Sequence, residues 1–107
     1  MELKPIVSTR VDDPDLDERI DRFVVHLAER VDGFQDAEAA QDRTALLALA
    51  DALAADATIL GYPLLVSAAE RIAEACGENV PESLRKGVVD LTELAQRVRR
   101  GHRSSAS

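Results

Sequence analysis

Apolar residues recur every three or four positions in four stretches of this 107-residue chain. That spacing places them on one face of a helix, which turns by about 100° per residue. Four helices that each carry an apolar stripe must bury it against one another, which favours helix-on-helix packing. The stripes are Leu16, Ile20, Phe23, Leu27, Val31 and Phe34; Leu46, Leu49, Ala50, Leu53, Ala57 and Leu60; Leu65, Ala68, Ala69, Ile72 and Cys76; and Leu84, Val88, Leu91, Ala95 and Val98.

Residues that favour helix ends stand between the stripes. Asp13 is predicted to cap the first helix, with Pro14 as its first residue and an end near Gln41. Asp42 is predicted to cap a central helix that covers residues 43–60. Short turns between long helices make neighbours antiparallel, so the prediction is an all-α, antiparallel up-and-down four-helix bundle. The remaining boundaries are expected at Gly61, Pro63, Gly77 and Asn79-Val80-Pro81.

The length suits one domain with one core. Residues 1–12 lack helical periodicity and are expected to form an extended lead-in. The bundle is expected to cover residues 13–100, and the serine-rich residues 101–107 are expected to form a flexible tail.

Charge and composition exclude several classes of partner. The formal net charge is −7, and every acidic residue precedes residue 97. Such a surface repels nucleic acid and anionic lipid, so neither is an expected partner. No apolar run approaches the length of a membrane span, and the single cysteine suggests a reducing compartment, so we expect a cytoplasmic protein. The tail arginines either offset a helix dipole or attract an acidic partner; they are Arg97, Arg99, Arg100 and Arg103.

Catalytic and metal-binding patterns are missing from the sequence. The acidic run at residues 12–18 lacks the glycine and the distal glutamate of a calcium loop. His26 has no second ligand nearby, and Cys76 ends an apolar stripe as a small core residue. No nucleophile–base pair, phosphate loop or metal motif is present. We therefore expect no enzyme activity, metal or cofactor.

The outer face of the central helix carries short side chains where a solvated face usually carries Lys, Glu and Gln. We interpret it as a docking face, although alanine also serves simply as the best helix former. Asp56, nearer the core, is expected to make a local hydrogen bond. The outer face collects Thr44, Ala48, Asp51, Ala52, Ala55, Thr58 and Ile59.

The order of these signals resembles the histidine-containing phosphotransfer (HPt) domain of bacterial phosphorelays. In that family a helix carries His-x-x-Lys-Gly, with a glycine ten residues after the histidine and then an aromatic residue. The resemblance covers nearly the whole chain and implies an HPt-like bundle. It is carried by the acidic lead-in, Phe23, Leu27, Asp42, Leu49-Ala50, Leu53, Ala57, Gly61-Tyr62 and Ala68-Ala69-Glu70-Arg71-Ile72.

The residues that carry the family's chemistry differ in this chain. Counting back ten from Gly61 places Asp51 at the phosphohistidine position, Ala54 at the lysine and Ala55 at the glycine. Phosphotransfer needs an exposed imidazole nucleophile, and the missing lysine removes a cation that offsets phosphoryl charge. The resemblance therefore implies that the chemistry is lost while the docking surface is kept.

The leading hypothesis is a non-catalytic, pseudo-HPt protein of two-component signalling that docks a receiver domain or a histidine kinase. Asp51 would partly imitate the charge of phosphohistidine. The alternative is a homodimeric helical-bundle protein that uses the same alanine-rich face, in which Asp51 would nearly face its own copy. The predicted docking residues are Thr44, Ala48, Asp51, Ala52, Ala54, Ala55 and Thr58.

Overall fold

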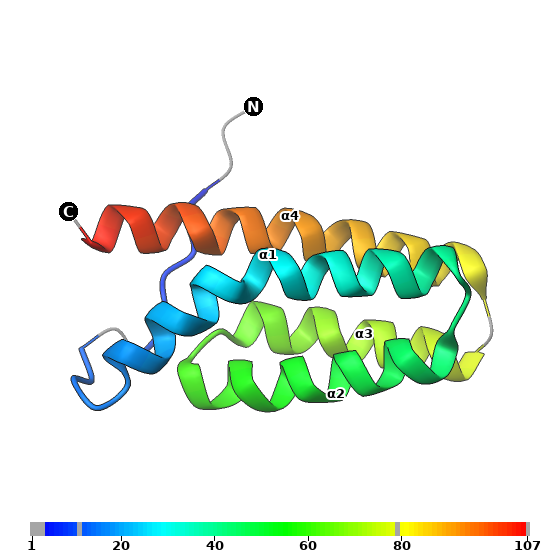
Figure 1. Ribbon diagram of the computed structural model, residues 1–107, viewed down its shortest axis with the longest axis horizontal. Helices are drawn as coiled ribbons and strands as arrows, with labels where there is room; N and C mark the ends of the chain where they lie inside the picture. Colours follow the sequence, from blue (N-terminus) through cyan, green and yellow to red (C-terminus); the bar gives the residue numbers. More distant parts are fainter. Residues whose placement is uncertain (1–3, 11, 79, 107) are drawn as a thin grey trace.

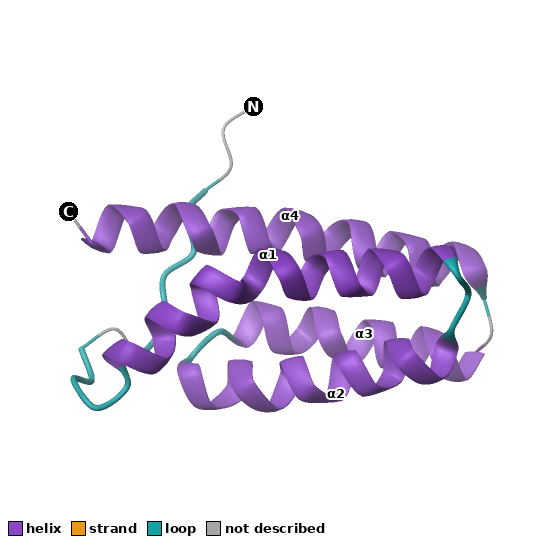
Figure 2. Ribbon diagram, viewed as in Figure 1, coloured by secondary structure: helices purple, strands orange, loops and turns teal. Residues whose placement is uncertain are grey.

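Four helices account for most of the computed structural model, which describes residues 4–10, 12–78 and 80–106 (Figures 1 and 2). The side chains of residues 103–106, Arg103 among them, lie outside the described part, as do Asn79 and Ser107. The helices are α1 (Asp17–Ala39), α2 (Arg43–Leu60), α3 (Pro63–Glu78) and α4 (Pro81–Ala106).

Each helix packs against the next in the chain, and α1 also packs against α4. Successive helices run in opposite directions along the long axis of the molecule (Figure 1). This all-α arrangement is consistent with the predicted up-and-down bundle. Every residue of the four apolar stripes is buried, except Leu16 and Leu49, which are half-buried.

An aromatic pair closes one end of the core. The rings of Phe23 on α1 and Tyr62, which precedes α3, stack with their centroids 5.6 Å apart. Tyr62 is only 2% exposed, and burial raises the pKa of its phenol to about 12.

The ends of α2 follow the sequence prediction. The amide of Ala45 donates a 3.0 Å hydrogen bond to the Asp42 carboxylate, which satisfies one free N–H of the first turn. Gly61 adopts the left-handed conformation at φ 82°. A Cβ at Gly61 would also lie 2.5 Å from Thr9 Oγ1, so both backbone geometry and close packing require glycine here.

The predicted start of α1 is wrong. The helix begins at Asp17, and Asp13 instead forms a turn in which its carboxylate accepts the amide of Asp15 at 3.0 Å. The Asp13 carbonyl accepts the amide of Leu16 at 3.1 Å. A short acidic side chain can satisfy nearby amides in a turn as readily as at a helix start, and here the turn is formed. At its other end α1 stops at Ala39, slightly before the predicted end.

Residues 4–10 of the lead-in lie across one end of the bundle. The amide of Ile6 donates to the carbonyl of Arg97 on α4 at 2.9 Å. The amide of Thr9 donates to the carbonyl of Gly61 at 2.8 Å. The lead-in therefore connects α4 to the turn between α2 and α3.

Close packing against the lead-in explains a glycine in α4. A Cβ at Gly101 would lie 2.1 Å from the carbonyl oxygen of Ile6. Gly101 is buried, and α4 continues through residues 101–106, which the sequence analysis assigned to the tail.

Candidate docking site on the central helix

The solvent-facing side of α2, called here the α2 face, is almost free of charge. Of its eight exposed positions between residues 44 and 59, only Asp51 is charged. In α1, eight of the eleven exposed positions between residues 17 and 36 are charged. The bundle therefore presents one helix surface unlike a typical solvated face. The α2 face consists of Thr44, Leu47, Ala48, Asp51, Ala52, Ala55, Thr58 and Ile59.

Two large apolar side chains border the α2 face. Leu47 is 43% exposed and Ile59 is 46% exposed. The sequence analysis placed Ile59 on this face but overlooked Leu47, which lies one turn before Asp51 and so shares its side of the helix. Small residues between two exposed apolar side chains form a shallow surface suited to another protein.

Asp51 stands alone on this surface. It is exposed and makes no hydrogen bond or ion pair with any other described residue. Ala54, at the position of the family's lysine, is half-buried against the core and adds little to the face. The Thr58 hydroxyl donates to the Ala54 carbonyl at 2.7 Å, so it is occupied within its own helix. The site offers one free carboxylate, without a neighbouring cation that could assist phosphoryl transfer.

The other predicted docking residues are placed as the pattern implied. Thr44, Ala48, Ala52 and Ala55 are all exposed on the same side of α2. The surface is continuous because these positions are three or four residues apart.

The expectation of a local hydrogen bond for Asp56 is wrong. Its carboxylate instead accepts a hydrogen bond from Arg30 Nη2 on α1, and the two groups form an ion pair. The guanidinium carbon of Arg30 lies 5.5 Å from the centroid of the Phe23 ring. This contact fixes α1 against the C-terminal half of α2, and sequence spacing alone could not reveal it.

The structure also places His26 and Cys76. His26 is exposed and lies 3.6 Å from the carboxylate of Glu29. Cys76 is a buried free thiol, and burial raises its pKa, with a smaller opposing effect from Arg43. A buried thiol with a raised pKa is a poor nucleophile. Among the described residues, no three His, Cys, Asp or Glu side chains are grouped to hold a metal ion.

None of the helices in the described ranges is both long and apolar enough to cross a membrane. Comparisons with family models, curated proteins and solved structures gave no significant match to this chain.

Proposed function

We propose that this chain is a non-catalytic, HPt-like docking protein of two-component signalling. It binds a receiver domain or the helices of a histidine kinase through the α2 face. The observation that carries the proposal is the composition of this face, on which Asp51 is the only charge and Leu47 and Ile59 are exposed at the borders.

Physical chemistry favours a protein partner over a small ligand at this surface. Short side chains allow a second backbone to approach α2 closely, and the two exposed apolar residues lose contact with water on binding. Because the face carries one charge, the interaction is mainly apolar and its affinity depends only weakly on salt.

Support for the HPt-like character comes from the position of Asp51 within the bundle. Asp51 is exposed near the middle of α2. The helix is capped at its C-terminus by Gly61, and the next residue is the buried Tyr62. The Asp51 carboxylate imitates the sign of a phosphoryl group, with about one charge against roughly two. With no imidazole and no neighbouring cation, Asp51 serves recognition rather than phosphotransfer.

The proposal is tested by calorimetric titration against receiver domains and kinase dimerisation helices encoded in the same genome. Ala55→Arg places a long cation at the centre of the α2 face and abolishes binding. Val89→Arg, at a position 58% exposed on α4, adds the same charge elsewhere and leaves binding intact. If no domain binds, or if both variants bind like the parent protein, the proposal fails.

The homodimer alternative is separated by light scattering across a concentration series. A stable dimer that Ala55→Arg converts to a monomer would replace the docking proposal. In that case Asp51→Ala strengthens the dimer because it removes repulsion between two nearby carboxylates.

A further inference from the structure

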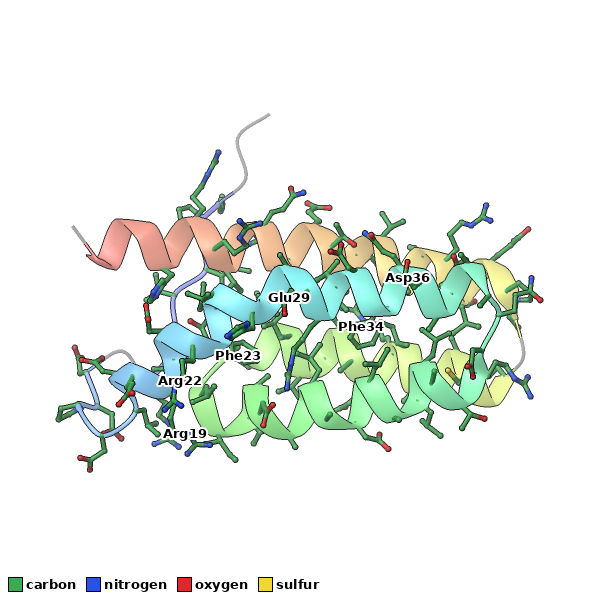
Figure 3. The ribbon with its side chains drawn as sticks, viewed as in Figure 1. Arg19, Arg22, Phe23, Glu29, Phe34 and Asp36 are labelled. Atoms are coloured by element: carbon green, nitrogen blue, oxygen red, sulfur yellow. The ribbon has the colours of Figure 1, made fainter. Side chains whose placement is uncertain are left out.

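A concave site with a cavity volume of about 360 Å³ lies between the first half of α1 and the C-terminal part of α2. Arg19 and Arg22 project from α1 beside Phe23 (Figure 3). The basic residues of the site are spaced three or four positions apart, so they share one face of α1. The site, called here the arginine pocket, is lined mainly by Arg19, Arg22, Phe23, His26, Arg30 and Asp56.

The charge of the arginine pocket opposes that of the whole protein. Three arginines and one carboxylate line it, whereas the chain has a formal net charge of −7. Like charges that are gathered on a small part of the surface create a local positive field there. An anion is therefore attracted to this part of a surface that is acidic overall.

The protein's own acidic side chains only weakly satisfy the outer cations. Arg22 lies 3.6 Å from the carboxylate of Glu18, and both side chains are largely exposed. Arg19 makes no ion pair or hydrogen bond with any residue that the structure describes. Exposed ion pairs contribute little, so an external anion can displace Glu18.

Arg30 is held in a fixed position, and Asp56 offsets its charge. Its Nη2 is held by Asp56, and its guanidinium lies over the Phe23 ring. Its Nη1 is buried and has no hydrogen-bond partner among the described atoms. Because Asp56 pairs with this guanidinium, Arg19 and Arg22 carry most of the pocket's net positive charge.

We propose that the arginine pocket binds a small anion with two or more linked phosphate groups. Arg19 and Arg22 donate to the phosphate oxygens, and the Arg30–Asp56 pair lies beside them in the pocket. Arg19 and Arg22 are about 4.5 Å apart along the helix axis, a spacing that linked phosphates can bridge. A phosphate also offers more acceptor oxygens than a carboxylate, so it competes better with Glu18.

A purely structural role for these arginines makes a different prediction. The last turn of α2 contains no basic residue, and the pocket reaches Leu60 at its end. Arg19 and Arg22 would then offset the negative end of the α2 dipole. In that case replacing them lowers stability, and no anion binds with saturation.

The test is an NMR titration of the full chain with inorganic pyrophosphate at constant ionic strength. We expect saturable shifts of the backbone amides between residues 19 and 30. The double variant Arg19→Gln/Arg22→Gln retains the Arg30–Asp56 pair and loses about tenfold in affinity per arginine removed. Arg71→Gln, at an exposed position on α3, is the matched control and binds like the parent protein.

Parallel titrations use inorganic phosphate and acetate. Phosphate is expected to bind more weakly than pyrophosphate, and acetate not to saturate. Equal pyrophosphate affinity in the double variant, equal shifts with acetate, or no saturation would each overturn the proposal. A loss of thermal stability in the double variant, without pyrophosphate binding by the parent, would assign both arginines to the helix dipole. No partner protein is used, so the outcome is independent of docking at the α2 face.

Discussion

Ionisation of Tyr62 should weaken the fold at alkaline pH. This tyrosine is 2% exposed and stacked on Phe23, and burial raises the pKa of its phenol from 10.0 to about 12. Below pH 10 the phenol is protonated in both the folded and the unfolded chain, so its contribution to stability is complete. Between pH 10 and about 12 the unfolded chain releases this proton while the folded chain retains it, so the free energy of unfolding falls.

The size of the effect follows from the pKa difference. A shift of one pKa unit corresponds to about 1.4 kcal/mol, so the full loss is about 3 kcal/mol. Domains of this size are stable by roughly 5–15 kcal/mol, so the loss is a substantial part of the total.

The assay is urea unfolding at a series of alkaline pH values, followed by circular dichroism. Tyr62 is the only tyrosine and the chain has no tryptophan, so phenolate absorbance reports its ionisation directly. Tyr62→Phe keeps the ring and removes the ionisable group. The stability difference between parent and variant therefore isolates Tyr62 from Cys76 and the lysines.

Two results would refute this reasoning. One is a phenolate titration near pH 10 in the folded protein. The other is a Tyr62→Phe variant that loses as much stability with rising pH as the parent.

Four substitutions test the packing. Gly61→Ala is expected to lower the free energy of unfolding by about 1–3 kcal/mol, because an alanine would be strained at φ 82°. At Gly77 a new Cβ would meet no atom within 4 Å beyond its own stretch of helix, so Gly77→Ala should instead raise the free energy of unfolding by up to about 1 kcal/mol. Gly101→Ala should displace the lead-in and accelerate hydrogen exchange of the Ile6 amide, and unchanged exchange would contradict the close contact. Asp56→Ala should lower the free energy of unfolding by about 1 kcal/mol because it removes the ion pair with Arg30. A double-mutant cycle between Asp56 and Arg30 that shows no coupling energy would contradict this ion pair.

Sequence reasoning succeeded where the deciding chemistry is local. Asp42 caps α2, Gly61 ends it and Pro63 opens α3, because each residue acts on a backbone within a few positions of itself. The buried stripes were equally predictable, since helical periodicity leaves one apolar face to bury.

The failures involve choices that local sequence leaves open or contacts between distant residues. Asp13 is suited to a turn or to a helix start, and only the folded chain selects the turn. From the sequence, Gly101 is predicted to start a tail. Its close contact with Ile6, which is distant in the sequence, becomes visible only in the folded chain. The partner of Asp56 lies on another helix, so the spacing around Asp56 carried no sign of it.

The two candidate sites differ in how far the sequence reveals them. The helical spacing of the apolar stripe in α2 already predicts which side of the helix is exposed. The sequence analysis nevertheless overlooked Leu47 at the edge of that side. The spacing of Arg19, Arg22 and Arg30 on α1 is also visible in the sequence. Interleaved acidic residues give it the pattern of an ordinary solvated helix, and the concavity arises only when α2 packs alongside.

The lead-in gives the molecule a defined response to mechanical load. Its hydrogen bonds include Arg97 Nε to the Lys4 carbonyl and the Ile6 amide to the Arg97 carbonyl at α4. At the α2–α3 turn they include the Ser8 hydroxyl to the Leu60 carbonyl and the Thr9 amide to the Gly61 carbonyl. We expect a force applied at Lys4 to open these bonds in chain order and to release about 20 Å of chain. The lead-in is therefore expected to detach from the bundle under load before the helices separate.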